Sequence, residues 1–341
     1  MRRVIAPPPA GPVKPGPPPT FSVVIATYQA AGTIAETIES ALAQTVAVHE
    51  VIVVDDGSTD ATHSVLAPYL DRLIYVRQPN RGAAAASNVA FRRASGTFVA
   101  ILDADDVFEP DRLEALTELA VSRPDLDILA TDAYYESGGE VVGRYNQANP
   151  FPNTRQNLEM LARCFVAEPA IRRETILAAG GFDESLRTGY DWECWIRLLH
   201  GGSVAGLVDE PLLRYRIVGG SSLTDNRVYA LRQRVRVLEA VAELDLSPEE
   251  RGELQRLMPT ARQRALLAEA ELALIEQTAD ARRRALRVAM EPGLAPRARL
   301  NGLAAALAPR MAARQLRRRE ARTGETRIRR MPPEQREGSA G

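Results

Sequence analysis

Two groups of aspartates in this sequence each follow a short apolar run, and this placement points to ligand chemistry. The groups are Asp55 with Asp56, after residues 50–54, and Asp103, Asp105 and Asp106, after residues 97–102. Carboxylates gathered at one place repel one another unless they face a cation or a set of hydroxyl donors. Carboxylate oxygens are hard ligands that suit Mg²⁺ or Mn²⁺, and a site with few of them leaves the remaining positions to water and phosphates. The second group therefore predicts a divalent metal that carries a diphosphate.

Simpler roles stay open for both groups. The second group would suit a solvated turn before a helix that begins near Pro110, and the first would suit the N-cap of a helix near residue 59. An EF-hand is excluded, because Val107 and Phe108 stand where that calcium loop needs an oxygen ligand and a glycine. No Gly-x-Gly-x-x-Gly sequence follows a strand, so a dinucleotide-binding fingerprint is absent.

The segments around these aspartates alternate β-branched runs with helical stretches. Expected strands are residues 21–26, 50–54, 72–77, 97–102 and 126–130, and expected helices are residues 33–43, 59–70, 83–94 and 111–121. Continuous apolar strands that alternate with helices are typical of a parallel sheet covered on both faces, the doubly wound α/β class. Ligands of such sheets bind at the carboxyl ends of the strands. Both aspartate groups are therefore expected at the same edge of the sheet.

Composition and pattern divide the chain into four regions. Residues 1–20 contain eight prolines and are expected to form a disordered tail. Strands are expected within residues 21–225, where the pattern loosens after residue 130 and a turn is expected at residues 137–139. Helices are expected in residues 226–316, and residues 317–341 are expected to form an Arg-rich disordered tail. Within the loose segment, helices are expected at residues 155–163, 173–179 and 191–200.

Several features predict a cytoplasmic protein that does not span a membrane. No apolar run approaches the roughly 18 to 20 residues of a membrane-spanning helix, and prolines occupy the place where a signal peptide has its apolar core. Cys164 and Cys194 are the only cysteines. Two cysteines 30 residues apart fit neither a disulfide framework nor a structural zinc site.

Four segments together resemble the inverting, family 2 type of nucleotide-sugar-dependent glycosyltransferase. In chain order they are SVVIATYQA (22–30), VIVVDDGSTDAT (51–62), GTFVAILDADD (96–106) and GGFDESLRTGYDWECWIRLL (180–199). The resemblance covers about residues 21–225 and implies a GT-A fold, a doubly wound and mostly parallel sheet with flanking helices. It implies an enzyme that moves a sugar from a nucleotide-diphosphate donor to a saccharide or lipid-linked acceptor, in cell-envelope or extracellular polysaccharide synthesis.

The resemblance also implies roles for individual residues. Tyr28 would flank the nucleotide base, Asp56 would accept a hydrogen bond from it, and Asp103 would lie by the ribose. Asp105, with Asp106 as a second ligand, would hold a Mg²⁺ or Mn²⁺ ion. Further residues implied for the nucleotide sugar are Ala26, Arg81 and Asn88, and those implied for the acceptor or diphosphate are Trp192, Glu193, Arg216 and Ser221.

Asp191 matches the position of the family's general base. A one-step inverting transfer needs the leaving-group charge neutralised on one face of the sugar and a carboxylate on the opposite face to take the acceptor's proton. Base and metal ligands must then come from different parts of the chain, as Asp191 and Asp105 do. Glu193 is a rival base, and Asp191 would otherwise serve as a helix N-cap.

One departure from the family supports a second hypothesis. Val218 stands where the family commonly has a histidine that reaches the metal or the phosphates. Because valine cannot ligate a metal, either the affinity for metal is weak, or Arg214, Arg216, Ser221 or Ser222 contacts the diphosphate instead. The second hypothesis is a catalytically weakened protein that binds nucleotide sugars or assists assembly.

The end of the chain is strongly basic and partly amphipathic. Residues 281–330 contain 15 Arg against 3 Glu, while Leu300, Leu303 and Leu307 recur on one helical face. Such a segment is either a partly disordered C-terminus or a peripheral helix on the anionic inner face of the cell membrane. Nucleic acid is not expected as a partner, because no aromatic residues are interleaved with the arginines.

Overall fold

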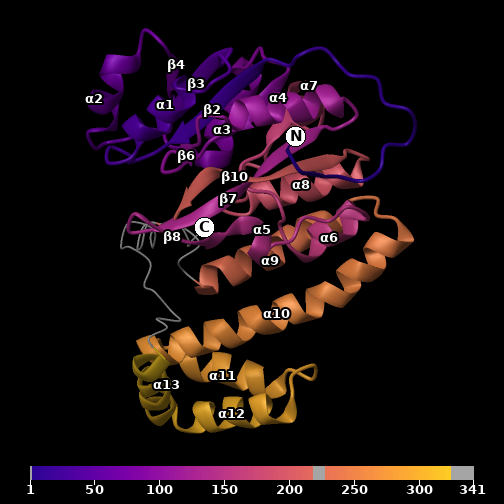
Figure 1. The fold of residues 1–341 in the computed structure, drawn as a ribbon. Helices are drawn as coiled ribbons and strands as arrows, with labels where there is room; N and C mark the ends of the chain where they lie inside the picture. Colours follow the sequence, from indigo (N-terminus) through magenta and orange to yellow (C-terminus); the bar gives the residue numbers. More distant parts are fainter. Residues whose placement is uncertain (1, 218–226, 324–341) are drawn as a thin grey trace. The chain divides into compact units, whose positions relative to one another are not determined.

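The apolar runs of the sequence pair into one sheet at the centre of the first part of the chain (Figure 1). The computed structural model describes residues 2–217 and 227–323, and the chain divides into two compact units, residues 1–218 and 219–341. Over the described residues the sheet has ten strands: eight lie in the order β1-β10-β7-β9-β5-β2-β3-β4, while β6 pairs with β10 and β8 with β7. The strands are β1 (Val4–Ile5), β2 (Phe21–Thr27), β3 (Glu50–Asp55), β4 (Ile74–Arg77), β5 (Phe98–Ile101), β6 (Val107–Phe108), β7 (Ile128–Ser137), β8 (Glu140–Arg144), β9 (Ala170–Arg172) and β10 (Ala205–Arg216).

The strand directions confirm the predicted class. β2 pairs in parallel with β3 and β5, β3 pairs in parallel with β4, and β7 and β10 form a second parallel pair. β9 lies between these two groups and is antiparallel to both β5 and β7. The fold is therefore the expected GT-A type, with a mostly parallel sheet, flanking helices and a helical C-terminal region.

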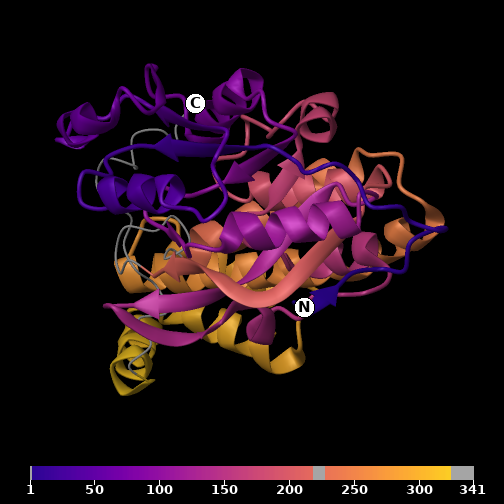
Figure 2. The same ribbon diagram turned by 45° about the horizontal axis from the view of Figure 1, so that its top comes forward.

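Helices cover both faces of this sheet, because successive strand residues point to opposite sides. Val23 and Ile25 of β2 share a core cluster with Ile38 of α1 and Leu116 of α4. The strands β3 and β5 lie on opposite sides of β2, so right-handed crossovers place α3 on the other face from α1 (Figure 2). The helices of this unit are α1 (Ile34–Leu42), α2 (Thr62–Leu66), α3 (Ala83–Arg93), α4 (Arg112–Ser122), α5 (Tyr145–Ala148), α6 (Gln156–Ala162), α7 (Arg173–Ala178) and α8 (Tyr190–His200).

The loosely patterned segment contains strands that the sequence does not predict. The expected turn is present, because β7 turns into β8 through Gly138 and Gly139, both of which have positive φ. β9 is only three residues long, and β6, earlier in the chain, has only two. β10 pairs with β7 through two register shifts on either side of Pro211. Short or interrupted strands lack the continuous apolar run by which a buried strand is recognised.

The expectation of disorder throughout residues 1–20 is wrong at the start of this segment. Val4 and Ile5 form β1, which pairs antiparallel with Val208 and Leu207 of β10. Next to this strand, Arg2 is an anchor that forms ion pairs with Asp111, Glu114, Glu118 and Glu210. Proline content misses this strand because the prolines begin only at residue 7.

The second unit is helical over its described residues, as predicted. Its helices are α9 (Arg227–Ala242), α10 (Pro248–Glu276), α11 (Ala281–Met290), α12 (Pro296–Leu307) and α13 (Pro309–Thr323). Ser247 and Glu250 form a capping box that starts α10. The Arg-rich tail expected from residue 317 is helical through Thr323, and its remainder, residues 324–341, lies outside the described residues. None of the helices in the described residues is both long and apolar enough to cross a membrane.

The positive φ of the Gly180-Gly181 pair leads to a stability prediction. A Cβ on Gly181 (φ +76°) would lie 2.3 Å from Asn88 Oδ1, whereas one on Gly180 (φ +84°) would meet no atom within 4 Å. Gly180→Ala should cost about 1 to 2 kcal/mol for the left-handed backbone alone. Gly181→Ala should cost about 1 to 3 kcal/mol more, because it displaces the buried amide of Asn88. Thermal unfolding of both variants measures the difference, and equal decreases in Tm would contradict the prediction.

Candidate functional site

The carboxyl ends of β2, β3 and β5 meet at one edge of the sheet, as expected. Thr27 at the end of β2 pairs with Asp55 at the end of β3. Leu102, just after β5, donates its N–H to the carbonyl of Val24. The sheet register therefore brings both aspartate groups to the same edge.

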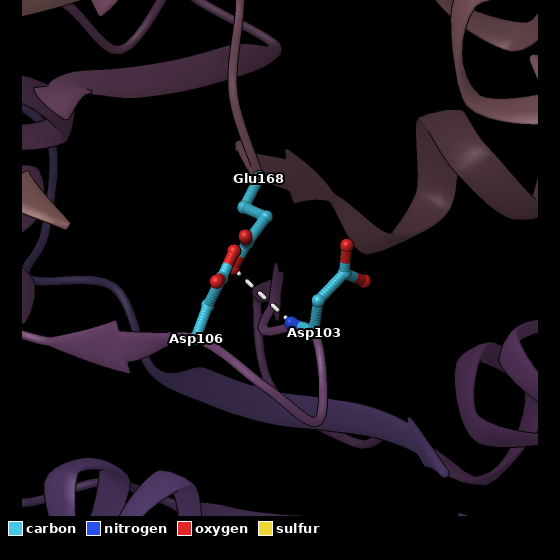
Figure 3. Close-up of side chains that lie close together, drawn as sticks. All are labelled: Asp103, Asp106 and Glu168. Carbon is cyan, nitrogen blue, oxygen red and sulfur yellow. Dashed lines mark hydrogen bonds between the residues drawn. The ribbon is translucent and has the colours of Figure 1, made fainter. Parts of the chain in front are cut away.

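Three carboxylates gather there: those of Asp103, Asp106 and Glu168 (Figure 3). One oxygen from each lies within 4.8 Å of the others, and we call these three residues the acidic cluster. The N–H of Asp103 donates a 3.1 Å hydrogen bond to Glu168 Oε2. Glu168 Oε1 is buried and has no hydrogen-bond donor among the described residues. The acidic cluster thus contains an acceptor that a proton or a cation would satisfy.

Burial and mutual repulsion change the protonation of the acidic cluster. Burial raises the pKa of Asp106 to about 6. Burial and the charges of Asp106 and Asp103 raise the pKa of Glu168 well above its usual range. Without a cation, burial and mutual repulsion therefore favour protonation of this pair of acids. Asp103 is solvent-accessible, yet the protein around it, together with the charges of Asp106, Asp105 and Asp191, raises its pKa well above the usual range.

A buried arginine offsets the charge of this pair. Arg112, at the start of α4, donates from Nη2 to the carbonyl of Glu168 at 2.6 Å and from Nη1 to Thr131 Oγ1 at 2.5 Å. Its guanidinium lies over the Phe108 ring, 4.6 Å from the centroid. Burial lowers the pKa of Arg112 to about 10, while the charges of Glu168 and Asp106 act in the opposite direction. Arg112 therefore stays charged at neutral pH and is the fixed counter-charge of the buried acids.

Neither Glu168 nor Arg112 is among the residues predicted from the sequence. Glu168 precedes β9, and because β9 is antiparallel to β5 its start lies at the carboxyl end of β5. The rule that ligand residues follow parallel strands therefore does not predict Glu168. One signal is present, since Glu168 is a single acid inside the otherwise apolar stretch FVAEPAI (165–171).

The acids that lie together in the structure differ from the two metal ligands, Asp105 and Asp106, that are expected from the sequence. Asp106 belongs to the acidic cluster, whereas Asp105 does not. Burial raises the pKa of Asp105, and the charge of Arg216 opposes that effect. The N–H of Arg216 donates to Asp106 Oδ1 at 2.7 Å, while its guanidinium lies 2.6 Å from Glu36 Oε2. Arg216 therefore adjoins the acidic cluster, beside Asp105.

Asp191 lies in the first turn of α8. It is the second residue of the helix and Gly189 is at the N-cap position, so the structure does not give Asp191 the N-cap role. Its carboxylate is solvent-accessible but surrounded by much protein, and this desolvation raises its pKa. The charge of Asp191 in turn contributes to the raised pKa of Asp103. Asp191 therefore lies close enough to Asp103 to affect its protonation, although the two residues are distant in the sequence.

The two residues that follow Asp191 are engaged with protein partners. Glu193 is buried and accepts hydrogen bonds from Arg197 Nε and Nη2 at 2.9 and 3.0 Å. Trp192 is buried, and its Nε1 donates to the carbonyl of Met160 at 2.6 Å. Asp191 is therefore the accessible acid of this helical turn, while Trp192 and Glu193 hold α8 in place.

Two of the residues expected around the nucleotide base differ in their surroundings. The ring of Tyr28 is exposed, whereas the carboxylate of Asp56 already has hydrogen-bond partners. Tyr28 is 50 % exposed just beyond β2, and Ala26 within β2 is half-buried. Asp56 is buried and already accepts three hydrogen bonds, from Gln78 Nε2 and from the N–H groups of Arg81 and Gly82, at 2.7 to 2.9 Å. The carboxylate of Asp56 therefore orders the loop before α3.

The side chains of Asn88 and Arg81 form hydrogen bonds with the segment that leads to α8. The Asn88 amide accepts from the N–H of Phe182 at 2.8 Å and donates to the carbonyl of Phe182 and to Glu184 at 2.9 and 3.1 Å. Arg81 donates to the other oxygen of Glu184 at 3.0 Å. Both side chains thus tie the segment before α8 to α3. Ser221, also expected near the diphosphate, lies outside the described residues, as does Val218.

Known proteins resemble this chain over its first unit. The family profile described as Glycosyl transferase family 2 matches residues 22–179. An uncharacterized glycosyltransferase of Rickettsia conorii is 30% identical over 213 residues, which are 59% of this chain and 33% of that protein. This chain therefore spans a third of the length of that relative. The glycosyltransferase TuaG of Bacillus subtilis, named for teichuronic acid biosynthesis, is 30% identical over 219 residues, 63% of this chain and 85% of TuaG.

Solved structures share the fold over nearly the whole chain. S. aureus TarS 1–349 in complex with UDP superimposes with a TM-score of 0.57 at 17% identity, covering 92% of this chain and 94% of that one. The mannosyltransferase PcManGT of Pyrobaculum calidifontis, in complex with GDP-Man and Mn²⁺, has a TM-score of 0.57 at 22% identity, covering 91% and 87%. At these identities the likeness concerns the fold. The match over most of TuaG goes further, and with the profile match it shows that this chain belongs to glycosyl transferase family 2.

Proposed function

We propose that this chain is an inverting glycosyltransferase that moves a sugar from a nucleoside diphosphate to a saccharide or lipid-linked acceptor. The observation that carries the proposal is the acidic cluster lying beside Asp191, because such a transfer needs both a cation site and a base. The name of TuaG supports cell-envelope or extracellular polysaccharide synthesis as the setting. A lipid-linked acceptor would place the protein in the cytoplasm, at the inner face of the cell membrane.

The nucleotide is proposed to bind at the edge formed by β2 and β3. The exposed ring of Tyr28 offers a face on which a base can stack. Asp56 has two oxygens engaged by the loop before α3, so its task includes shaping that loop as well as facing the base. Asp103 is the accessible carboxylate for the ribose side. The UDP and GDP-Man complexes of TarS and PcManGT support a nucleotide-sugar donor.

A Mg²⁺ or Mn²⁺ ion fits the acidic cluster. The donor set is three hard carboxylates, one of which, Glu168, has a buried oxygen without a donor. Asp103, Asp106 and Glu168 would hold the ion, with Asp105 and Arg216 beside the diphosphate. An ion bound there would neutralise the charge that develops on the leaving diphosphate. Arg112 stabilises the ionised form of Glu168 and Asp106 and so prepares them for a cation.

Asp191 is proposed as the base. As the acceptor oxygen attacks the anomeric carbon, Asp191 takes the hydroxyl proton, the bond from that carbon to the diphosphate oxygen breaks, and the configuration inverts. A raised pKa makes Asp191 a stronger proton acceptor than an ordinary exposed aspartate. Glu193 is not proposed, because both its oxygens are engaged by Arg197.

The second hypothesis, a weakened nucleotide-sugar binder, depends on Val218 in place of a histidine. Glu168 offers an acidic ligand whatever residue stands at position 218. We therefore favour the enzyme over the binder. An enzyme would hydrolyse the bound donor or transfer its sugar, whereas a binder would leave the donor intact.

Substitutions in α8 separate binding from chemistry. Asp191→Asn keeps the shape of the side chain but cannot take a proton, so transfer should fall at least about 10²-fold. Affinity for the nucleotide sugar, found first by thermal shift with UDP-, GDP- and dTDP-sugars, should persist. Glu193→Gln should retain transfer while it lowers the Tm, because Arg197 loses its ion pair. The reverse pattern, an active Asp191→Asn and an inactive Glu193→Gln, would assign the base to Glu193.

The ligand set of the ion can be tested without turnover. Mn²⁺ binding followed by electron paramagnetic resonance, with UDP or GDP present, should weaken at least about 10-fold in Glu168→Gln and in Asp103→Asn. Asp105→Asn is the matched control and should lose less affinity, because Asp105 is outside the acidic cluster. If Asp105→Asn abolishes Mn²⁺ binding while Glu168→Gln retains it, the pair expected from the sequence is the correct one.

The raised pKa of Asp106 predicts that stability and metal binding depend on pH. The pKa of Asp106 is raised to about 6 in the folded protein, so the folded state binds more protons than the unfolded state between about pH 4 and 6. Stability without metal should therefore fall as pH rises through this window, and Asp106→Asn should reduce the fall. Because Mn²⁺ must displace the proton, Mn²⁺ should raise the Tm more at about pH 7.5 than at about pH 5.5. An increase in Tm that does not depend on pH would contradict the displacement of a proton by Mn²⁺.

A further inference from the structure

Large apolar side chains are exposed along one face of α12. Leu300, Leu303 and Leu307 are 66, 44 and 74 % exposed, and Met311 at the start of α13 is 61 % exposed. The spacings of three and four residues place the three leucines along one side of α12, and Met311 follows in the first turn of α13. We call these four residues the outer apolar face.

The opposite side of α12 is fixed against its own unit. Gly302, Ala305 and Ala306 are buried, and α12 packs against α11 and α13. A Cβ on Gly302 would lie 2.8 Å from Val288 Cγ1 and 2.9 Å from the carbonyl of Ala285, so α11 and α12 approach closely there. This close contact between α11 and α12, which lie side by side in Figure 1, sets the rotation of α12 and leaves the three leucines exposed.

The outer apolar face lies in a strongly basic part of the chain. Residues 281–318 contain ten arginines and a single acid, Glu291. Some of the arginines have partners, such as Arg284, which pairs with Asp280 and Glu269. The exposed arginines that form no ion pair with any described residue include Arg297, Arg310, Arg314 and Arg318. The surface therefore combines exposed leucines with unneutralised positive charge.

We propose that this surface of α12 and α13 binds an anionic lipid bilayer. Acyl chains would take the leucines and Met311, while the phosphates of anionic lipids would neutralise the arginines. A second copy of this chain would bring the same positive charges together, and a nucleic acid would leave the leucines in water. An anionic bilayer offers apolar contacts to the leucines and negative charge to the arginines. The proposal does not depend on the proposed sugar transfer.

The test is flotation of the full chain with vesicles. Vesicles of phosphatidylcholine with phosphatidylglycerol should carry the protein, vesicles of phosphatidylcholine alone should carry less, and added salt should weaken the binding. The variant Leu300→Gln, Leu303→Gln, Leu307→Gln should lower partitioning at least about 10-fold. The single variant Leu307→Gln should give a smaller decrease and guards against a triple variant that misfolds. Arg310→Gln, Arg314→Gln, Arg318→Gln should remove the preference for anionic lipid.

The matched control is Val141→Thr with Val142→Thr, because these exposed valines lie on β8 in the first unit. This variant should float as the unchanged protein does, and donor hydrolysis should be unaffected by the leucine substitutions. Unchanged flotation of both leucine variants would overturn the proposal. So would leucine variants that dissociate an oligomer in analytical ultracentrifugation without altering flotation, since the occupant would then be a second copy.

Discussion

The buried pair of acids, Asp106 and Glu168, is the constraint on which much of the first unit depends. Burying two carboxylates is costly unless a proton or cation lies between them and positive charge lies close by. The protein meets both needs, because the raised pKa values of both acids favour a bound proton and the guanidinium of Arg112 lies close by. These groups come from the segment after β5, the segment before β9 and the first turn of α4, while β10 contributes the N–H of Arg216. Four elements must therefore meet at the same point for the site to exist.

That requirement explains why the sequence predicts the frame of the site better than its contents. The five expected strands are continuous apolar runs, and their parallel order follows from the helices between them. The edge that carries Asp103 and Asp106 could be predicted from that order alone. Glu168 could not, because nothing local says that β9 runs antiparallel and brings its start to this edge. Arg112 reads as an ordinary helix-surface residue until its partners, distant in the sequence, are known.

A similar limit applies to the residues assigned from family resemblance. Asn88 and Arg81 hold the segment before α8 through Phe182 and Glu184. Their contribution to a nucleotide site is then indirect, through the placement of the helix that carries Asp191. A motif identifies positions in a sequence. The role of a polar side chain also depends on its hydrogen-bond partners, which come from segments distant in the sequence. In the second unit the helices were predictable, but which leucines face outward depends on the close approach at Gly302.

The backbone of Glu168 has a consequence for how this protein would respond to selection. Its φ of +41° lies in the left-handed region, where a residue with a Cβ is strained by about 1 to 2 kcal/mol. Glycine or asparagine at this position would relieve the strain and remove a buried acid, and so would favour folding twice over. A screen for thermostability alone would therefore enrich replacements of Glu168, and the enriched proteins would have lost an acid of the cluster. If glutamate is retained at this position in nature despite its strain, the organism needs the site more than it needs the added stability.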